Sequence, residues 1–344
     1  METKFGIFAY NSYNIGDEIQ SLAASRFLPK IDYLINREKT NSFSPHSSQE
    51  EVKVIMNAWY MWRPKNFPPS KYINPLFVST CFSKQIQNSR FLTSKTIGYL
   101  REHGPIGCRD MGTLSFLEKN SIPAYFSGCL TLTLQGSKVK KDNYVLCVDV
   151  SQEVVEAIKK KTSLPVVSLS KLIAPFVNSK NRFLVAKAIL FAFQNAHVIF
   201  TSNLHTVLPA LSLETPVCFL NPGKDDQFFD WNGRFSGLKD LFFVSSIDDF
   251  VLHNSYDVNC PPKNPVKYLD MREKLILRCE QFTGFDSKKP LFEDGYDPSL
   301  DLLYVLRHSE NDFQRSLMFA TPVDLFKALW ERTIKHKNYL DIQD

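Results

Sequence analysis

The stretch VIFTSNLHTVLPALSLETPVCFLN, residues 198–221, contains a complete strand–helix–strand unit. Its first four residues and residues 216–221 form short apolar runs with β-branched and aromatic side chains, which are typical of buried strands. Between them, apolar residues recur at helical spacing over residues 204–213. Two such strands joined by a helix predict a βαβ unit in a parallel sheet.

The same alternation of strands and helices continues along the chain in both directions. In the second half we expect further strands at residues 144–150, 165–168 and 242–244, and helices near residues 152–161 and 181–195. In the first half we expect helices after Asp17 and Asp110, and strands at residues 5–9, 52–56, 76–80, 105–108 and 124–126. The fold class is therefore predicted to be α/β, with a Rossmann-like arrangement in each half.

Length and composition favour two domains. A chain of 344 residues with 44% hydrophobic content exceeds what one core usually serves, and the polar stretch Gln135–Asn143 is the best candidate linker. We therefore predict an N-terminal domain over residues 1–138, a C-terminal domain over residues 139–300 and a terminal segment over residues 301–344. In that segment Thr321, Pro322 and Asp324 form a helix-start signal. The helix that follows is expected to pack on the first domain; a partner interface is the alternative.

Charge and cysteine content restrict the class of protein. The 41 basic and 36 acidic residues leave a net charge of +5, which is too small and too dispersed for a nucleic-acid partner. No apolar run approaches the ~20 residues of a transmembrane segment, and the N-terminus lacks the features of a signal peptide. Seven widely spaced cysteines without a C-x-x-C pair indicate reduced thiols. A cytoplasmic location is therefore expected, and the sequence leaves the oligomeric state open.

Ligands of open α/β sheets bind where the strands end, so residues that follow strands are the candidates for a site. Arg109 and Asp110 follow the expected strand at residues 105–108. A guanidinium at such a position can hold a phosphate or carboxylate through paired hydrogen bonds. The alternative is an ion pair of Arg109 with Asp110 or Glu118.

The turn after the first strand contains Asn14, Gly16 and Asp17. The glycine permits a tight turn, and the acid stands at a helix start, where the helix dipole favours negative charge. A ligand site and an ordinary capped turn are equally compatible with this pattern.

His205 is expected in the first turn of a helix capped by Thr201 or Ser202, directly after a strand. A phosphate or carboxylate bound there would raise its basicity into the range that is useful for proton transfer. The alternative is a histidine of the core or of the helix cap.

Two further stretches mix charge with glycine. One contains Lys224, and the other, residues 230–238, contains Trp231 and Arg234, which suit contact with an anion or a sugar. No metal-binding motif, P-loop or G-x-S-x-G motif is present, so chemistry by positioned charge and proton transfer is expected.

At these segments the chain resembles the polysaccharide pyruvyl transferase family. The resemblance rests on an ordered set of segments: Asn14–Asp17 with Ile19–Ala24, Gly104–Asp110, Ser127–Leu134, and Thr201–His205 continuing to Leu211. It implies two Rossmann-like domains that face a central cleft, as in GT-B glycosyltransferases. It also implies phosphoenolpyruvate as co-substrate, with no cofactor or metal, and an acceptor that is a polysaccharide or its precursor, possibly lipid-linked. The product would be a pyruvate ketal on a pair of sugar hydroxyls.

Roles follow from the resemblance together with the positions of the residues. The candidate catalytic residues are His205, Asp17 and Asp110. The candidate donor-binding residues are Arg109, Ser202, Asn203, Leu204, Lys224 and Arg234. The candidate acceptor-binding residues are Asn14, Gly16, Trp59 and Trp231.

The chain departs from the family pattern at Asn203, where members commonly carry arginine. Asn203 supplies no charge against a phosphate, so either Lys224 or Arg234 substitutes or the donor differs. Two alternatives to a pyruvyl transferase therefore stay open: a GT-B-type glycosyltransferase that uses a nucleotide sugar, and a degenerate family member without catalytic activity.

Overall fold

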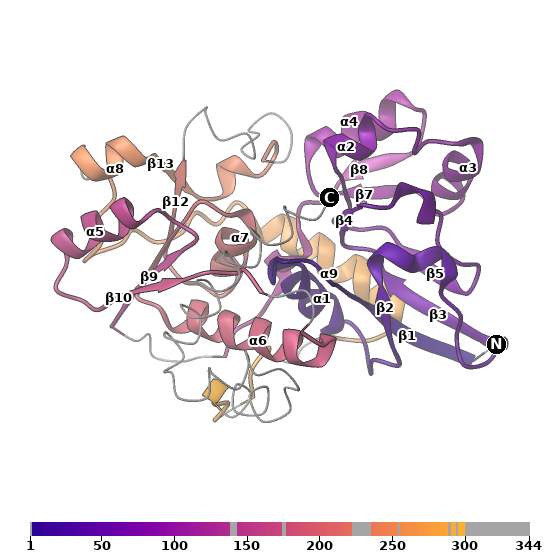
Figure 1. Cartoon of the computed structure of the whole chain (residues 1–344), viewed down its shortest axis with the longest axis horizontal. Coiled ribbons are helices and arrows are strands. Elements are labelled where there is room, and N and C mark those ends of the chain that lie inside the picture. The colour runs from indigo at the N-terminus through magenta and orange to yellow at the C-terminus, as the bar shows by residue number, and fades with distance from the viewer. Residues whose placement is uncertain are drawn as a thin grey trace, which may run out of the picture.

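The computed structural model describes residues 2–137, 143–173, 177–221, 235–253, 255–287, 290–293 and 295–299. Parallel sheets dominate both halves of the chain, as the sequence predicted. In Figure 1 the two sheets lie beside each other, the first at the right and the second at the left.

The first half contains a parallel sheet with the strand order β2-β1-β3-β5. These strands are β1 (Glu2–Ala9), β2 (Tyr33–Asn36), β3 (Glu50–Ile55) and β5 (Ile73–Leu76). Beyond β5, the backbone of residues 77–80 hydrogen-bonds to β7 (Ile106–Cys108), which pairs with β8 (Ala124–Phe126). The strand expected at residues 76–80 is therefore divided: its first residue pairs with β3, and residues 77–80 pair with β7.

The remaining elements of this half are helices and two short strands. They are α1 (Gly16–Ser25), the 3-10 helices η1 (Arg37–Ser42) and η2 (Pro64–Asn66), β4 (Trp59–Tyr60) paired with β6 (Cys81–Phe82), α2 (Lys84–Gln87), α3 (Ser94–Glu102), α4 (Met111–Lys119) and the 3-10 helix η3 (Leu130–Thr133).

The second half contains a parallel sheet with the strand order β10-β9-β11-β12-β13. Its strands are β9 (Val145–Val148), β10 (Val166–Leu169), β11 (Val198–Thr201), β12 (Val217–Asn221) and β13 (Phe243–Ser246). Its helices are α5 (Gln152–Lys161), α6 (Ser179–Asn195), α7 (Leu204–Ser212) and α8 (Ile247–His253), with the 3-10 helix η4 (Lys239–Leu241) before β13. The βαβ unit expected over residues 198–221 is confirmed as β11, α7 and β12.

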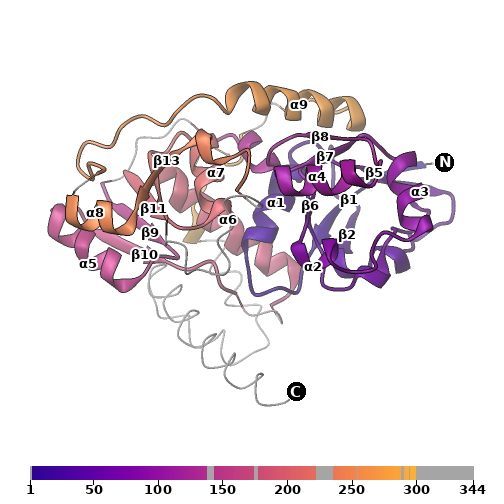
Figure 2. The same cartoon turned by 90° about the horizontal axis from the view of Figure 1, so that it is seen from above.

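One helix of the later chain returns to the first half. This helix, α9 (Leu269–Thr283), runs along one side of the molecule in Figure 2. The guanidinium of Arg278 lies 4.6 Å from the ring centre of Tyr125, and Nζ of Lys53 donates to the carbonyl of Phe282 at 2.7 Å. Residues that the sequence assigned to the second domain thus pack on the first sheet.

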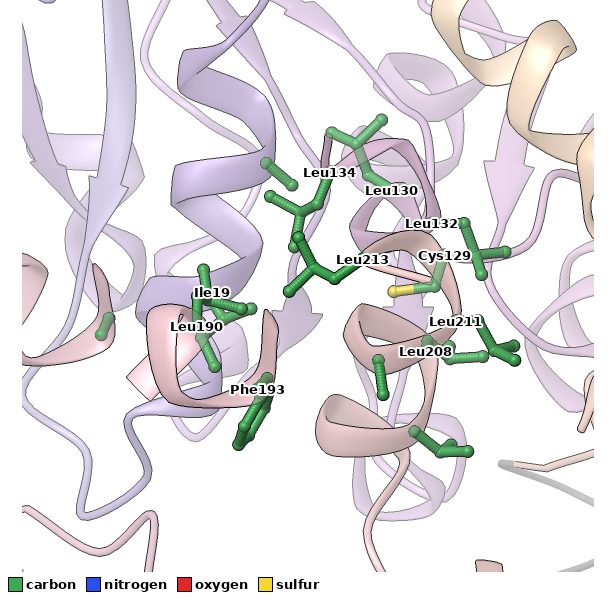
Figure 3. Close-up of a cluster of buried hydrophobic side chains, with 14 of the residues drawn as sticks. Ile19, Cys129, Leu130, Leu132, Leu134, Leu190, Phe193, Leu208, Leu211 and Leu213 are labelled. Carbon is green, nitrogen blue, oxygen red and sulfur yellow. The ribbon is translucent and has the colours of Figure 1, made fainter. Parts of the chain in front are cut away.

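A hydrophobic cluster joins the two halves. Figure 3 shows Ile19 of α1 close to Leu190 and Phe193 of α6, with side chains of η3 and α7 completing the cluster. A second cluster fills the first half and a third lies in the second half. The halves are therefore packed together through α1, and their apolar contact is continuous.

Two predictions fall outside the described residues. The division at residues 138–139 lies among residues 138–142, and the helix expected from about residue 322 lies in the terminal segment. In the part of the chain that the structure describes, no helix is long and apolar enough to span a membrane.

Candidate active site

The ends of strands from both sheets meet at one place. The loop after β1 is hydrogen-bonded to the segment after β10: the amide of Ile15 donates to the carbonyl of Lys171, and the amide of Ile173 donates to the carbonyl of Tyr13, both at 2.9 Å. Asn14 forms an isolated antiparallel bridge with Leu172 between these bonds. Candidate residues from the two halves are thereby brought together.

The first turns of α1 and α7 are in direct contact through Gly16 and His205. A Cβ atom added to Gly16 would lie 2.9 Å from Nδ1 of His205 and 3.0 Å from Oδ1 of Asn14. The first distance is too short for a Cβ atom unless the imidazole shifts, and the second is tighter than an ordinary contact. The absence of a side chain at Gly16 therefore lets the imidazole lie against the start of α1.

His205 faces Arg109, which comes from the other half of the chain. Nη1 of Arg109 lies 3.1 Å from Nε2 of His205 and donates to Oε1 of Gln20 at 3.0 Å. Both Arg109 and His205 are buried. Because a guanidinium only donates hydrogen bonds, Nε2 of His205 is the acceptor and carries no proton in this arrangement. The imidazole is therefore neutral, with its proton on Nδ1.

Arg109 does not form the ion pair that the sequence left open as an alternative. Among the described residues no carboxylate lies within ion-pair distance of its guanidinium. Nε and Nη2 make no hydrogen bond to an oxygen or nitrogen there, although the thiol of Cys81 lies beside the group. A buried cation without a counter-charge is costly, so this position favours an anionic ligand.

Asp110, expected as a catalytic residue, has another role in this structure. It caps α4: Oδ1 accepts from the amide of Thr113 at 2.7 Å, and Oδ2 accepts from the hydroxyl of the same residue at 3.2 Å. Both carboxylate oxygens are therefore occupied within the helix start. The structure gives Asp110 no contact with His205.

Asp17 lies inside the first turn of α1 and does not cap the helix. Its Oδ2 accepts from the hydroxyl of Ser12 at 2.9 Å and lies 3.4 Å from Nη1 of Arg37, while Oδ1 accepts from Nε2 of Gln20 at 3.4 Å. Gln20 in turn binds Arg109. A continuous polar chain therefore connects Arg37, at the end of β2, with Arg109.

Three predicted donor-binding residues, Ser202, Asn203 and Leu204, lie at the start of α7, and each makes a different contact. Asn203, not Thr201 or Ser202, caps α7, and its Oδ1 accepts from the amide of His205 at 2.9 Å. Ser202 donates its hydroxyl to the carbonyl of Leu220 at 2.6 Å. The side chain of Leu204 belongs to the shared hydrophobic cluster. Of the three side chains, that of Asn203 is hydrogen-bonded to the backbone of His205.

Three other predicted residues, Lys224, Arg234 and Trp231, lie outside the described residues. Trp59 is half-buried, and its ring lies 5.2 Å from the guanidinium carbon of Arg37.

A pocket of about 380 Å³ opens at the ends of β1 and β2. Its lining includes Trp62 but not Trp59, together with Ser12, Arg37 and Arg63.

A buried ion pair supports the contact between the halves. Glu18 of α1 receives two hydrogen bonds from Arg182 of α6, at 2.5 and 3.1 Å. Burial raises the pKa of Glu18 to about 7, although Arg182 acts in the opposite direction. Within the second half, Nζ of Lys171 lies 3.6 Å from the carboxylate of Asp149, which follows β9.

Several of these residues were missed by the sequence analysis. Lys171 lies two residues after β10, so the rule that identified Arg109 could also have selected it. Asp149 follows β9 in the structure but lay inside the strand expected at residues 144–150, so the rule passed over it. Arg37 follows β2, a strand that the sequence analysis did not predict. Gln20 gave no signal of its own within the helical pattern.

Comparison with known proteins agrees with the resemblance. The family model of polysaccharide pyruvyl transferases matches residues 14–224, more than half of the chain, and this range contains Asp17, Arg109 and His205. No curated protein matches the chain. A solved structure of a functionally uncharacterised Klebsiella pneumoniae protein is similar at 12% identity and a TM-score of 0.37, covering 67% of this chain and 87% of that one. On the strength of the family model, this chain belongs to the polysaccharide pyruvyl transferase family.

Proposed function

We propose that this protein transfers a pyruvyl group from phosphoenolpyruvate to a pair of hydroxyls on a polysaccharide or its precursor, forming a pyruvate ketal. The observation that carries the proposal is the contact between Arg109 and His205. A buried guanidinium without a carboxylate partner among the described residues suits an anionic donor, and a histidine 3.1 Å away suits proton transfer.

The reaction needs an anion clamp and a path for two protons. Protonation of the methylene carbon of phosphoenolpyruvate gives an oxocarbenium-like centre at C2, which one sugar hydroxyl attacks. The second hydroxyl then attacks C2 as the C–O bond to phosphate breaks. Of the two hydroxyl protons, one replaces the proton given to the methyl group and the other leaves with phosphate.

In this scheme Arg109 holds the carboxylate or phosphate of the donor. An anion there withdraws the guanidinium from Nε2 of His205 and favours the imidazolium, so donor binding prepares His205 to protonate the methylene carbon. Asn203 contributes the neutral Nδ2–H group where family members commonly carry a charged arginine.

The test is phosphate release and product mass with phosphoenolpyruvate and a galactose- or mannose-containing acceptor. His205→Ala and His205→Gln should lower turnover by about 10²–10⁴-fold at every pH, because neither side chain can transfer a proton. His253→Ala, at an exposed histidine of α8, is the matched control. Wild-type rates in the His205 variants would remove this residue from the mechanism.

Arg109 is tested by donor binding. Arg109→Lys keeps the charge but loses the paired geometry, and it should weaken phosphoenolpyruvate binding by at least about tenfold in calorimetry. Arg90→Lys, at an exposed position, is the control. Unchanged affinity in folded Arg109→Lys would show that Arg109 is structural.

A further inference from the structure

The pocket at the ends of β1 and β2 has a size and place that suit a ligand. Its volume of about 380 Å³ falls within the usual range of ligand sites, and it lies at the carboxyl ends of parallel strands. Two of its lining residues, Ser12 and Arg37, contact Asp17, from which the polar chain runs through Gln20 to Arg109. The pocket therefore adjoins the proposed active site.

The carboxylate of Glu38 is fully engaged within the pocket wall. Its Oε1 accepts from Nε of Arg37 at 2.9 Å. Its Oε2 accepts from the amides of Trp62 and Arg63, at 2.9 and 3.0 Å. Glu38 and Asp17 together neutralise Arg37. The two amide bonds to Glu38 also fix the backbone at Trp62 and Arg63, whose side chains line the pocket.

Two cations in the lining are left without a counter-charge. Lys39 and Arg63 are exposed, and within the described part of the chain neither forms an ion pair. Their charges add to a pocket whose one lining carboxylate is already engaged, so the local field is positive. Such a field favours a ligand that carries a phosphate or a carboxylate.

An aromatic surface stands beside these cations. Trp62 is 61% exposed, and Trp59 supports it with ring centres 4.8 Å apart. An indole ring offers a flat, rigid apolar face with little conformational entropy to lose on binding. The C–H face of a pyranose ring is a matching surface.

The geometry points to this pocket as the acceptor site, specific for an anionic saccharide. The sugar ring packs on Trp62, and its phosphate or carboxylate is held by Arg63 and Lys39. The role as acceptor site rests on the proposed function, whereas the binding of an anionic saccharide does not.

Binding can be measured on the full chain by calorimetry with four probes. Galactose 1-phosphate and galacturonate carry the ring with a phosphate or a carboxylate, galactose carries the neutral ring, and inorganic phosphate carries the anion alone. Both anionic sugars should bind at least about tenfold more tightly than galactose or phosphate, because only they use the cations and the indole together. Added salt should weaken their binding.

Variants locate the site. Trp62→Ala and Arg63→Ala should each weaken the anionic sugars by about tenfold, as expected for the loss of one charged or aromatic contact. Arg90→Ala, which removes an exposed arginine elsewhere, should bind as the wild type does. If the anionic sugars bind no more tightly than galactose, if phosphate alone binds as tightly as they do, if none binds at millimolar concentration, or if the variants leave binding unchanged, the inference is wrong.

The outcome is separable from that of the proposed function. Binding that depends on Trp62 and Arg63, without phosphate release from phosphoenolpyruvate, would support the pocket and contradict the transferase. Transfer with an acceptor KM unchanged by Trp62→Ala and Arg63→Ala would support the transferase and overturn the pocket.

Discussion

Gly16→Ala tests the contact between α1 and α7 on which the candidate active site depends. Replacing a glycine in the middle of a helix by alanine ordinarily stabilises it by about 0.5–1 kcal/mol, and at Gly16, the first residue of α1, the gain is at most of this size. At Gly16 the new methyl group would lie 2.9 Å from Nδ1 of His205 and 3.0 Å from Oδ1 of Asn14. Neither neighbour is free to move, because His205 is buried against Arg109 and Asn14 accepts from the amide of Gly16 at 2.9 Å.

Overpacking of this kind typically costs about 1–3 kcal/mol. Since this cost exceeds the gain in helix propensity, Gly16→Ala should lower the free energy of unfolding by about 1–2 kcal/mol. Displacing the imidazole should also disturb its bond with Arg109, so turnover should fall as well. Urea unfolding followed by circular dichroism measures the first effect, and phosphate release measures the second.

Gly98 provides a matched control on α3. A Cβ atom there would meet nothing within 4 Å, so Gly98→Ala should stabilise the protein by about 0.5–1 kcal/mol. In a His205→Ala background the penalty at Gly16 should shrink, because the 2.9 Å contact with Nδ1 is lost and only the contacts with Asn14 at 3.0 Å and with the Cβ atom of residue 205 at 3.1 Å remain. If Gly16→Ala stabilises the protein as Gly98→Ala does, or costs the same with and without His205, the two helix starts are not in contact.

The remaining predictions concern the contact between the halves and the departure from the family pattern. Burial raises the pKa of Glu18 from 4.5 to about 7, so the folded protein binds this proton more readily than the unfolded chain does. Stability should therefore fall as pH rises from 4.5 through 7, and Glu18→Gln should flatten this dependence in urea titrations at several pH values. Arg182→Leu should lower the free energy of unfolding by about 3–5 kcal/mol, because it leaves Glu18 buried and unpaired. The double variant Glu18→Leu, Arg182→Leu should recover most of that loss. Equal stability of the wild type and Arg182→Leu would contradict the ion pair. Asn203→Arg should tighten phosphoenolpyruvate binding in calorimetry if this is the donor, whereas weaker binding would indicate a pocket adapted to another ligand.

The second sheet could be predicted because its central strands are buried on both faces. Continuous apolar runs such as residues 145–148 and 217–220 are characteristic of parallel strands, and burial in the structure is complete there. The strand β2 was missed because it is a four-residue edge strand whose Leu34 is exposed. Its apolar run, residues 33–35, is only three residues long and is bounded by Asp32 and Asn36, so the run was not recognised as a strand.

The site could be predicted only as far as the strand-end rule extends. That rule identified Arg109 and His205, which prove to be hydrogen-bonded across the two halves. It could not foresee that Asp110, predicted as catalytic, and Asn203, predicted to bind the donor, both cap helices in the structure. Gln20 was missed because its contact with Arg109 depends on how α1 packs, and side-chain spacing along the chain does not determine that.

The burial that makes Arg109 suited to an anion also closes the site, so a donor needs an opening. Separating the two halves as rigid bodies would expose the shared cluster around Ile19, Leu190 and Phe193, at about 1.5–3 kcal/mol for each large apolar side chain. Releasing His205 from Arg109 breaks one hydrogen bond, worth about 1–3 kcal/mol, which the donor anion can replace. The cluster contains many such side chains, whereas only one hydrogen bond joins His205 to Arg109. Exposing the cluster therefore costs far more free energy than breaking that bond. If the proposed donor binds at Arg109, we therefore expect it to enter by local movement at the starts of α1 and α7, with the shared core intact.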